Sequence, residues 1–178
     1  MKRIFLAAAA VIAAEALGAS ADCRTRTFVG PTRIVWSTNA CGAAVLTSPR
    51  LGQVPEGRFL EGTGCRLLAG TNGAPSAVLL DFGRELHGSL QIGNGAAGRG
   101  ARARVRFGES ASEAMAELGE KGAQNDHAIR DSVIDLPWAG SREIGNTGFR
   151  FVRIDCVSGP VALESVRAVS LMRPMERL

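Results

Sequence analysis

The segment Gly145–Asp155 reads GNTGFRFVRID and decides the fold that the sequence predicts. In its second half, apolar residues such as Phe149, Phe151 and Ile154 alternate with charged residues such as Arg150. This alternation is typical of a half-buried strand in a sandwich of two sheets. The two glycines of the segment predict a turn before the strand, because glycine adopts a positive φ at little cost.

Short runs of similar character follow one another along the rest of the chain. The runs that we expect to form strands are 26–29, 32–37, 66–68, 77–82, 89–92, 101–107, 131–136, 149–157 and 161–171. Segment 110–118 differs, since Ser110 and Glu113 have the spacing of a helix cap, and it predicts a short helix. The sequence therefore predicts an all-β fold, an antiparallel β-sandwich of jelly-roll or galactose-binding-like type with one short helix.

The first 21 residues have the features of a secretory signal peptide. Met1-Lys2-Arg3 supplies positive charge, residues 4–14 are apolar, and Ala19-Ser20-Ala21 has the small residues of a cleavage site. The apolar run is too short to anchor the chain in a membrane. We expect residues 1–21 to be removed and residues 22–178 to form one secreted or periplasmic β-sandwich domain.

The charge of the chain argues against nucleic acid as a partner. The formal net charge is only +4, and the basic residues are mostly isolated arginines rather than runs of Lys and Arg. The glycines at 93–100 lack the strand and helix that surround a phosphate-binding loop, so no nucleotide cofactor is expected.

Four cysteines, Cys23, Cys41, Cys65 and Cys156, remain after the signal segment. An even number in an exported chain favours disulfides, and three connectivities are open. We favour Cys41 with Cys65, because both flank loops in the same half of the domain, which leaves Cys23 for Cys156. A metal site is disfavoured because the chain has no CxxC pair.

Two groups of polar residues are candidates for a functional site. Glu109 with Asp126 or Asp131 has the residue types of a glycosidase carboxylate pair, but pairing of Glu109 with Arg130 is the favoured interpretation. The triplet Asn125-Asp126-His127 supplies the oxygens that a sugar or calcium needs, but an Asx turn is the favoured interpretation.

Exposed aromatic rings are a further sign of sugar binding, because sugar faces stack on them. Trp138 follows Pro137 and precedes a small-residue turn, so we expect it at the surface, whereas Trp36 is expected in the core. The candidate glycan-contacting residues are Glu109, Asn125, Asp126, His127 and Trp138.

Several motifs occur in an order that is more specific than any one of them. They are Leu80–Gly88, Arg104–Ser110, Ser112–Met115, Lys121–Asp131 and Gly145–Asp155. Together they resemble the N-terminal β-sandwich domain of bacterial α-L-rhamnosidase-type glycoside hydrolases (family 78-like). The resemblance extends over residues 25–173 and is strongest in 78–155.

In that family, the sandwich domain precedes an (α/α)6 barrel whose glutamates act as general acid and general base. The resemblance implies that this chain reaches Leu178 about where the barrel begins, so no catalytic residue is carried over. It implies a non-catalytic accessory domain, inactive alone, whose partner is the barrel or a glycan. The alternative is a free-standing carbohydrate-binding or interaction module.

Overall fold

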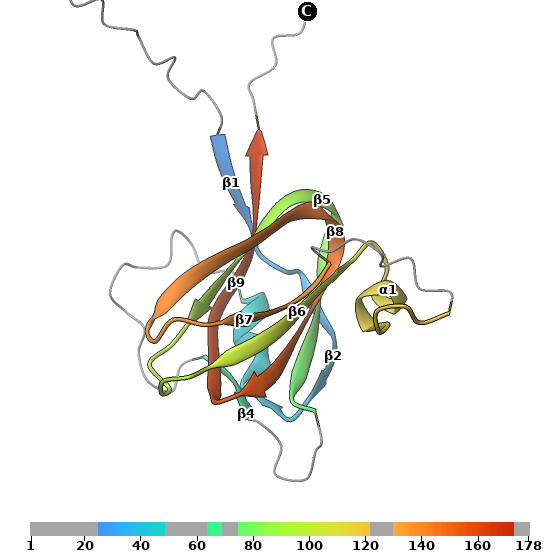
Figure 1. Ribbon diagram of the computed structural model, residues 1–178. Helices are drawn as coiled ribbons and strands as arrows, with labels where there is room; N and C mark the ends of the chain where they lie inside the picture. The colour runs from blue at the N-terminus through green and yellow to red at the C-terminus, as the bar shows by residue number, and fades with distance from the viewer. Residues whose placement is uncertain (1–24, 49–63, 69–74, 122–129, 173–178) are drawn as a thin grey trace, which may run out of the picture.

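The computed structural model describes residues 25–48, 64–68, 75–121 and 130–172 of the chain. Antiparallel strands make up most of these residues, in agreement with the predicted all-β class (Figure 1). The elements are β1 (Thr25–Val29), β2 (Arg33–Thr38), β3 (Ala40–Cys41), the 3-10 turn η1 (Ala43–Thr47), β4 (Cys65–Leu68), β5 (Ala77–Asn94), β6 (Arg102–Gly108), α1 (Ala111–Met115), β7 (Asp131–Asp135), β8 (Gly140–Ser158) and β9 (Pro160–Met172).

The strands form two layers that share their longest members. Layer A contains β2, residues 77–82 of β5, residues 151–158 of β8, β6 and β7. Layer B contains residues 86–94 of β5, residues 140–149 of β8, and β9 with β1, β4 and β3 beyond it. Both β5 and β8 therefore pass from one layer to the other, and the hydrogen-bonded ladder is continuous through the sandwich.

The crossing is made by an irregularity in the pairing of β5 with β8. The pairing shifts register between Asp81 and Leu86 of β5, so the residues between them form a bulge. Gly83 lies in this bulge with φ of 77°. A Cβ added to Gly83 would lie 3.1 Å from the Thr32 side chain, so both the backbone angle and the limited space favour glycine. The bulge bends the strand and redirects its side chains.

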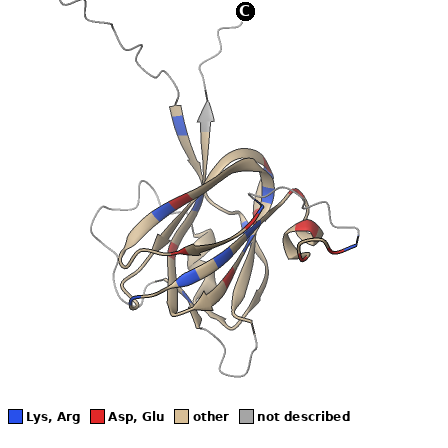
Figure 2. Cartoon of the chain, viewed as in Figure 1, with Lys and Arg blue, Asp and Glu red and all other residues tan. Residues whose placement is uncertain are grey.

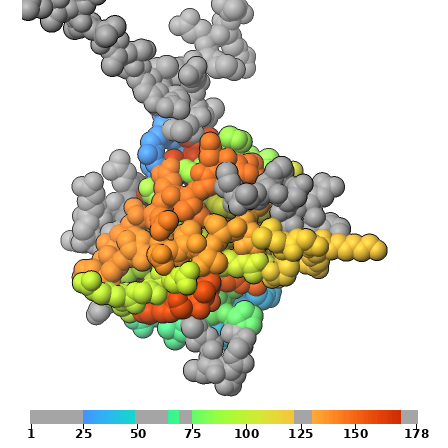
Figure 3. Space-filling view, in the orientation of Figure 1, coloured from blue at the N-terminus to red at the C-terminus, as the bar shows by residue number. Residues whose placement is uncertain are grey.

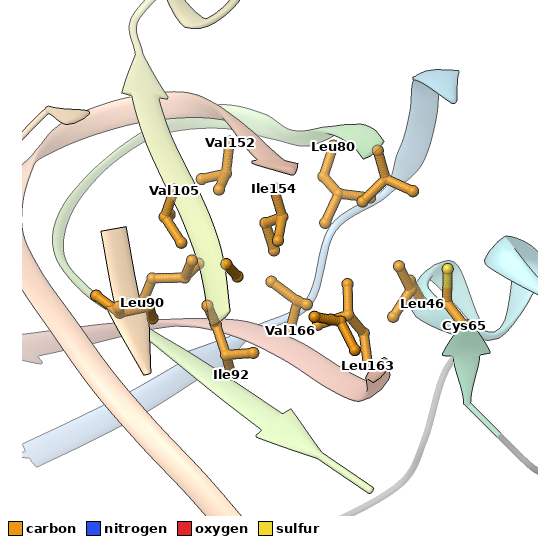
Figure 4. Packing of buried hydrophobic residues seen from close by; sticks show 14 of the residues in the cluster. Leu46, Cys65, Leu80, Leu90, Ile92, Val105, Val152, Ile154, Leu163 and Val166 are labelled. Carbon is orange, nitrogen blue, oxygen red and sulfur yellow. The ribbon is translucent and has the colours of Figure 1, made fainter. Parts of the chain in front are cut away.

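The main core lies between the layers and draws on both. Leu80, Val105, Val152 and Ile154 of layer A face Leu90, Ile92, Leu163 and Val166 of layer B, together with Leu46 and Cys65 (Figure 4). Three phenylalanines close the core near the crossing. The Phe149 ring lies edge-on to Phe82, with centroids 5.5 Å apart, and to Phe107, with centroids 5.1 Å apart.

The segment that predicted the fold behaves differently from a simple alternating strand. The expected turn at residues 145–148 lies inside β8 instead, and Gly145 has φ of 79° there. Phe149, Val152 and Ile154 enter the main core, but Phe151 faces the other side of layer A. This change of face occurs where β8 crosses between the layers, so a local pattern of period two could not reveal it.

A second, smaller apolar cluster covers the outer side of layer A. It contains Leu79, Phe151 and Ala114, with Trp36 and Met115 packed against it. Trp36 was expected in the core and instead lies here, half-buried, because β2 shifts register between Ile34 and Trp36. The short helix α1 is thus a cover for the outer side of layer A.

The predicted helix cap is confirmed. The Ser110 hydroxyl accepts a hydrogen bond from the Glu113 amide at 3.1 Å, and the Glu113 carboxylate accepts one from the Glu109 amide at 2.7 Å. These two bonds satisfy amides that the helix itself leaves unpaired. Together they explain why so short a helix has a defined position, and Figure 3 shows its segment projecting from the side of the body.

Substituting Gly108 with alanine is expected to lower the free energy of unfolding by about 2 kcal/mol, because the tight approach of α1 leaves no room for a side chain. A Cβ there would lie 2.5 Å from the Ala114 amide nitrogen and 2.7 Å from the Ser110 carbonyl oxygen. Urea unfolding measures the effect. Gly148→Ala is the matched control, since its Cβ would meet nothing closer than 3.6 Å. Equal effects of the two substitutions would contradict the close packing of α1.

The predicted Cys41–Cys65 disulfide is absent, and both residues are free thiols. The register pairs Cys41 with Arg66, which places Cys65 on the opposite face of the ribbon. Cys65 is buried in the core. Its burial raises the pKa of the thiol to about 11, and the nearby Cys41 makes a smaller contribution in the same direction. Pairing of Cys156 with Cys23 involves a residue outside the described part of the chain.

No helix among the described residues has the length and apolar character needed to cross a membrane. The proposed signal segment, residues 1–21, lies outside the described residues.

Candidate functional site

Arginines recur along β6, and acidic residues occur in and after α1 beside it (Figure 2). Arg106 is central among them and is only 3% exposed. Its guanidinium donates to the carbonyl oxygens of Met115 at 3.2 Å and Ala116 at 3.4 Å, and to the carboxylates of Glu117 at 3.0 Å and Asp155 at 3.1 Å. The face of β6 that carries the arginines is therefore partly buried, and Arg106 holds the carboxyl end of α1 to the sheet.

Asp131, proposed as a partner of Glu109, has a different role. Its carboxylate accepts two hydrogen bonds from Arg104, at 2.8 and 2.5 Å, across β6 and β7. These bonds raise the pKa of Arg104, and Glu117 contributes to the same shift. An arginine fork on a nearly buried aspartate joins two strands and leaves this carboxylate no place in an acid–base pair with Glu109.

Glu109 lies beyond the end of β6, where it joins a small cluster around Gly148. Arg130 donates to the Glu109 carboxylate at 3.1 Å, which is the pairing expected from the sequence. Arg130 also forms an ion pair with Glu113. A Cβ placed on Gly148 would lie 3.8 Å from the Glu109 carboxylate and 3.6 Å from that of Glu85. The two carboxylates therefore approach each other over a glycine.

Glu85 is the member of this cluster that sequence analysis missed. Burial and then the charge of Glu109 raise the pKa of Glu85, and Arg130 acts in the opposite direction. Glu85 comes from the bulge of β5, so its proximity to Glu109 depends on the crossing between layers and leaves no local signal in the sequence.

Trp138 is exposed, as predicted, with 55% of its surface accessible. It lies in the connection between β7 and β8, and the Arg99 guanidinium lies 5.8 Å from the centre of its ring. The connection is held by buried Asn94, whose amide donates to the Pro137 carbonyl at 2.9 Å and accepts from the Ala162 amide at 3.0 Å. Trp138 is thus a surface aromatic on a fixed turn.

The candidate residues do not form one site. Glu109 follows the last residue of β6, whereas Trp138 follows Asp135, which pairs with Arg102 at the first residue of β6. The two are therefore at opposite ends of that strand. Asn125, Asp126 and His127 lie outside the described residues, so their relation to Glu109 stays a prediction. In the described ranges, no cluster of three or more His, Cys, Asp or Glu residues could hold a metal ion.

The fold and the two regions define an antiparallel β-sandwich with a surface aromatic and a polar cluster on different ends. No protein-family model matches the sequence, and no curated protein is significantly similar to it. Among solved structures, a rhamnosidase from Klebsiella oxytoca with rhamnose bound is similar with a TM-score of 0.53 and 13% identity, over 83% of this chain and 29% of that one.

Two further similarities are weaker. A GH78 family rhamnosidase of Bacillus sp. GL1 gives a TM-score of 0.45 and 16% identity, over 62% of this chain and 11% of that one. An α-L-rhamnosidase from Dictyoglumus thermophilum gives a TM-score of 0.43 and 18% identity, over 83% of this chain and 13% of that one. The chain thus spans under a third of the length of each of these rhamnosidases. The resemblance to a rhamnosidase sandwich domain is confirmed for the fold.

Proposed function

We propose that this chain is a non-catalytic accessory domain of a rhamnosidase-type glycoside hydrolase, which contacts glycan or supports a catalytic (α/α)6 barrel. One observation carries the proposal. A sandwich that aligns over 83% of this chain occupies only 29% of the rhamnosidase from Klebsiella oxytoca. We also propose export of the domain after removal of residues 1–21, and boundaries at 22–178.

The ion pairs of the carboxylates support a non-catalytic role. Inverting hydrolysis needs one carboxylic acid and one carboxylate base, placed apart on two sides of the sugar. Asp131 is committed to Arg104, and Glu109 and Glu113 share Arg130. We therefore expect the purified chain to leave an aryl α-L-rhamnoside intact over hours. Turnover that disappears in Glu109→Gln would overturn the proposed role.

Trp138 is the residue that we propose to contact glycan directly. Substitution with alanine removes the ring on which a sugar face stacks, so binding of a rhamnose-containing oligosaccharide is expected to weaken about tenfold. Isothermal titration calorimetry measures the affinity. Leu118→Ala is the control, because Leu118 is exposed to a similar extent, 56%, but lies beyond α1. Unchanged binding in Trp138→Ala would remove Trp138 from the glycan contact.

The alternative function is a free-standing carbohydrate-binding or interaction module. The turn that carries Trp138 favours this alternative. Asn94 holds the turn through hydrogen bonds to Pro137 and Ala162, and all three residues belong to the sandwich itself. The reading frame downstream of Leu178 distinguishes the two. A helical region rich in Trp and Glu supports the accessory domain, and unrelated sequence supports the module.

A further inference from the structure

Arg167 differs from the other arginines that are buried or half-buried in the described ranges. The others each form an ion pair with a carboxylate, and they are Arg104, Arg106, Arg130, Arg150 and Arg153. Arg167 lies in β9 on the outer side of layer B, and within the described residues no carboxylate pairs with it. A partly buried charge without a counter-charge is costly, which singles this residue out.

The contacts of Arg167 hold its guanidinium in place without neutralising it. One terminal nitrogen donates to the Gln91 side-chain oxygen at 2.5 Å, and the group lies 4.6 Å from the centre of the Phe28 ring. Its Nε is buried and has no hydrogen-bond partner. Burial lowers the pKa of Arg167, but an arginine keeps its charge at any physiological pH.

The register of the strands surrounds Arg167 with polar groups. Gln91 pairs with Arg167 on one side and with Glu143 on the other, so these three side chains form a row across β9, β5 and β8. In the next row, Ser165 pairs with Gly93, which has no side chain. The Ser165 hydroxyl is also buried without a hydrogen-bond partner. Arg167 and Ser165 thus each have one buried polar atom without a hydrogen-bond partner, on the same face of β9.

We propose that Arg167, with Gln91 beside it, binds the carboxylate of an acidic sugar of the uronic acid class. This rests on the glycan contact proposed above and adds the class of sugar that this face accepts. The guanidinium supplies the charge-assisted bonds that a carboxylate requires, and the Gln91 amide nitrogen is a donor for a neighbouring ring hydroxyl.

The neighbours of Arg167 favour a sugar over the carboxylate of a docking protein. A protein interface has an apolar centre, but this face offers Phe28 at 38% exposure amid polar side chains. Glu143 supplies a fixed acceptor for a sugar hydroxyl, since the Ser89 hydroxyl donates to it at 2.5 Å and Arg26 pairs with it. The row of Arg167, Gln91 and Glu143 therefore offers both hydrogen-bond donors and acceptors, which matches a sugar that carries several hydroxyl groups and one carboxylate.

The test is a titration followed by NMR chemical shifts, with sodium D-glucuronate, D-glucose and sodium acetate as probes. We expect glucuronate to bind about tenfold more tightly than glucose or acetate, because only glucuronate uses both the charge and the hydroxyl partners. Arg167→Gln is expected to remove this preference. Arg102→Gln is the matched control, since Arg102 is an exposed arginine at the other layer.

Each other outcome decides against the proposal. Equal binding of glucuronate and glucose, or a preference that survives Arg167→Gln, overturns it, and equal binding of acetate overturns the assignment to a sugar. Arg167→Lys covers the case in which Arg167→Gln does not fold, because it keeps the charge and loses the planar fork, and it is expected to weaken glucuronate about fivefold. The titration of a rhamnose-containing oligosaccharide described above tests the contact at Trp138 separately, so failure of the glucuronate site is distinguishable from failure of the proposed function.

Discussion

Replacing Phe149 with alanine is expected to lower the free energy of unfolding by about 4 kcal/mol, the largest effect of any single substitution considered. Phe149 is fully buried and its ring contacts those of Phe82 and Phe107 edge-on. Its removal loses the burial of the ring and both aromatic contacts, and it leaves a cavity where neither layer can collapse easily. Thermal and urea unfolding of the purified domain measure the loss.

Phe28→Ala is the control for this prediction. Phe28 is 38% exposed on β1, so the same change of side chain is expected to cost less than about 1.5 kcal/mol. Similar costs at the two positions would show that Phe149 does not organise the core.

Asp81→Asn is expected to cost about 3 kcal/mol, because it removes one charge from a buried and hydrogen-bonded network. Asp81 is 1% exposed. Its carboxylate accepts from Arg150 at 2.8 and 3.1 Å, from Arg33 at 2.9 Å and from the Gly83 amide at 2.7 Å. Asp135→Asn is the control, since its pair with Arg102 is largely exposed and is expected to contribute less than about 0.5 kcal/mol.

The same network gives stability a dependence on pH. Hydrogen bonds from Arg150 lower the pKa of Asp81 to about 2, with smaller contributions from Gly83 and Arg33, while burial acts in the opposite direction. The folded-state pKa lies below the unfolded value, so the stabilisation is fully present above about pH 4. It is lost as the pH falls towards 2. Asp81→Asn should flatten this acid limb of the unfolding curve, and an unchanged limb would argue against the assignment.

The class of fold was predictable from local patterns, whereas the course of the two longest strands was not. Runs 77–82 and 89–92 were identified separately, and the structure joins them in β5. The residues between them include glycines and charges, which locally indicate a loop. Their pairing with β8 makes them strand, and that partner lies about sixty residues away in the sequence.

The candidate site was predictable only where one residue sufficed. The exposure of Trp138 followed from its neighbours in the sequence, and the pairing of Glu109 with Arg130 followed from their charges. The proximity of Glu85 to Glu109, and the lack of a carboxylate paired with Arg167 among the described residues, both depend on registers between distant strands. Contacts of this kind can be found only when the pairing of the strands is known, because they do not follow from the spacing of residues in the sequence.

The passage of β5 and β8 through both layers has a consequence for how the domain comes apart. Each layer contains part of β5 and part of β8, so unfolding of one layer would disrupt strands that continue into the other. The bulge at Gly83, where β5 crosses between the layers, would lose its pairing as well. We therefore expect the domain to unfold as a single cooperative unit.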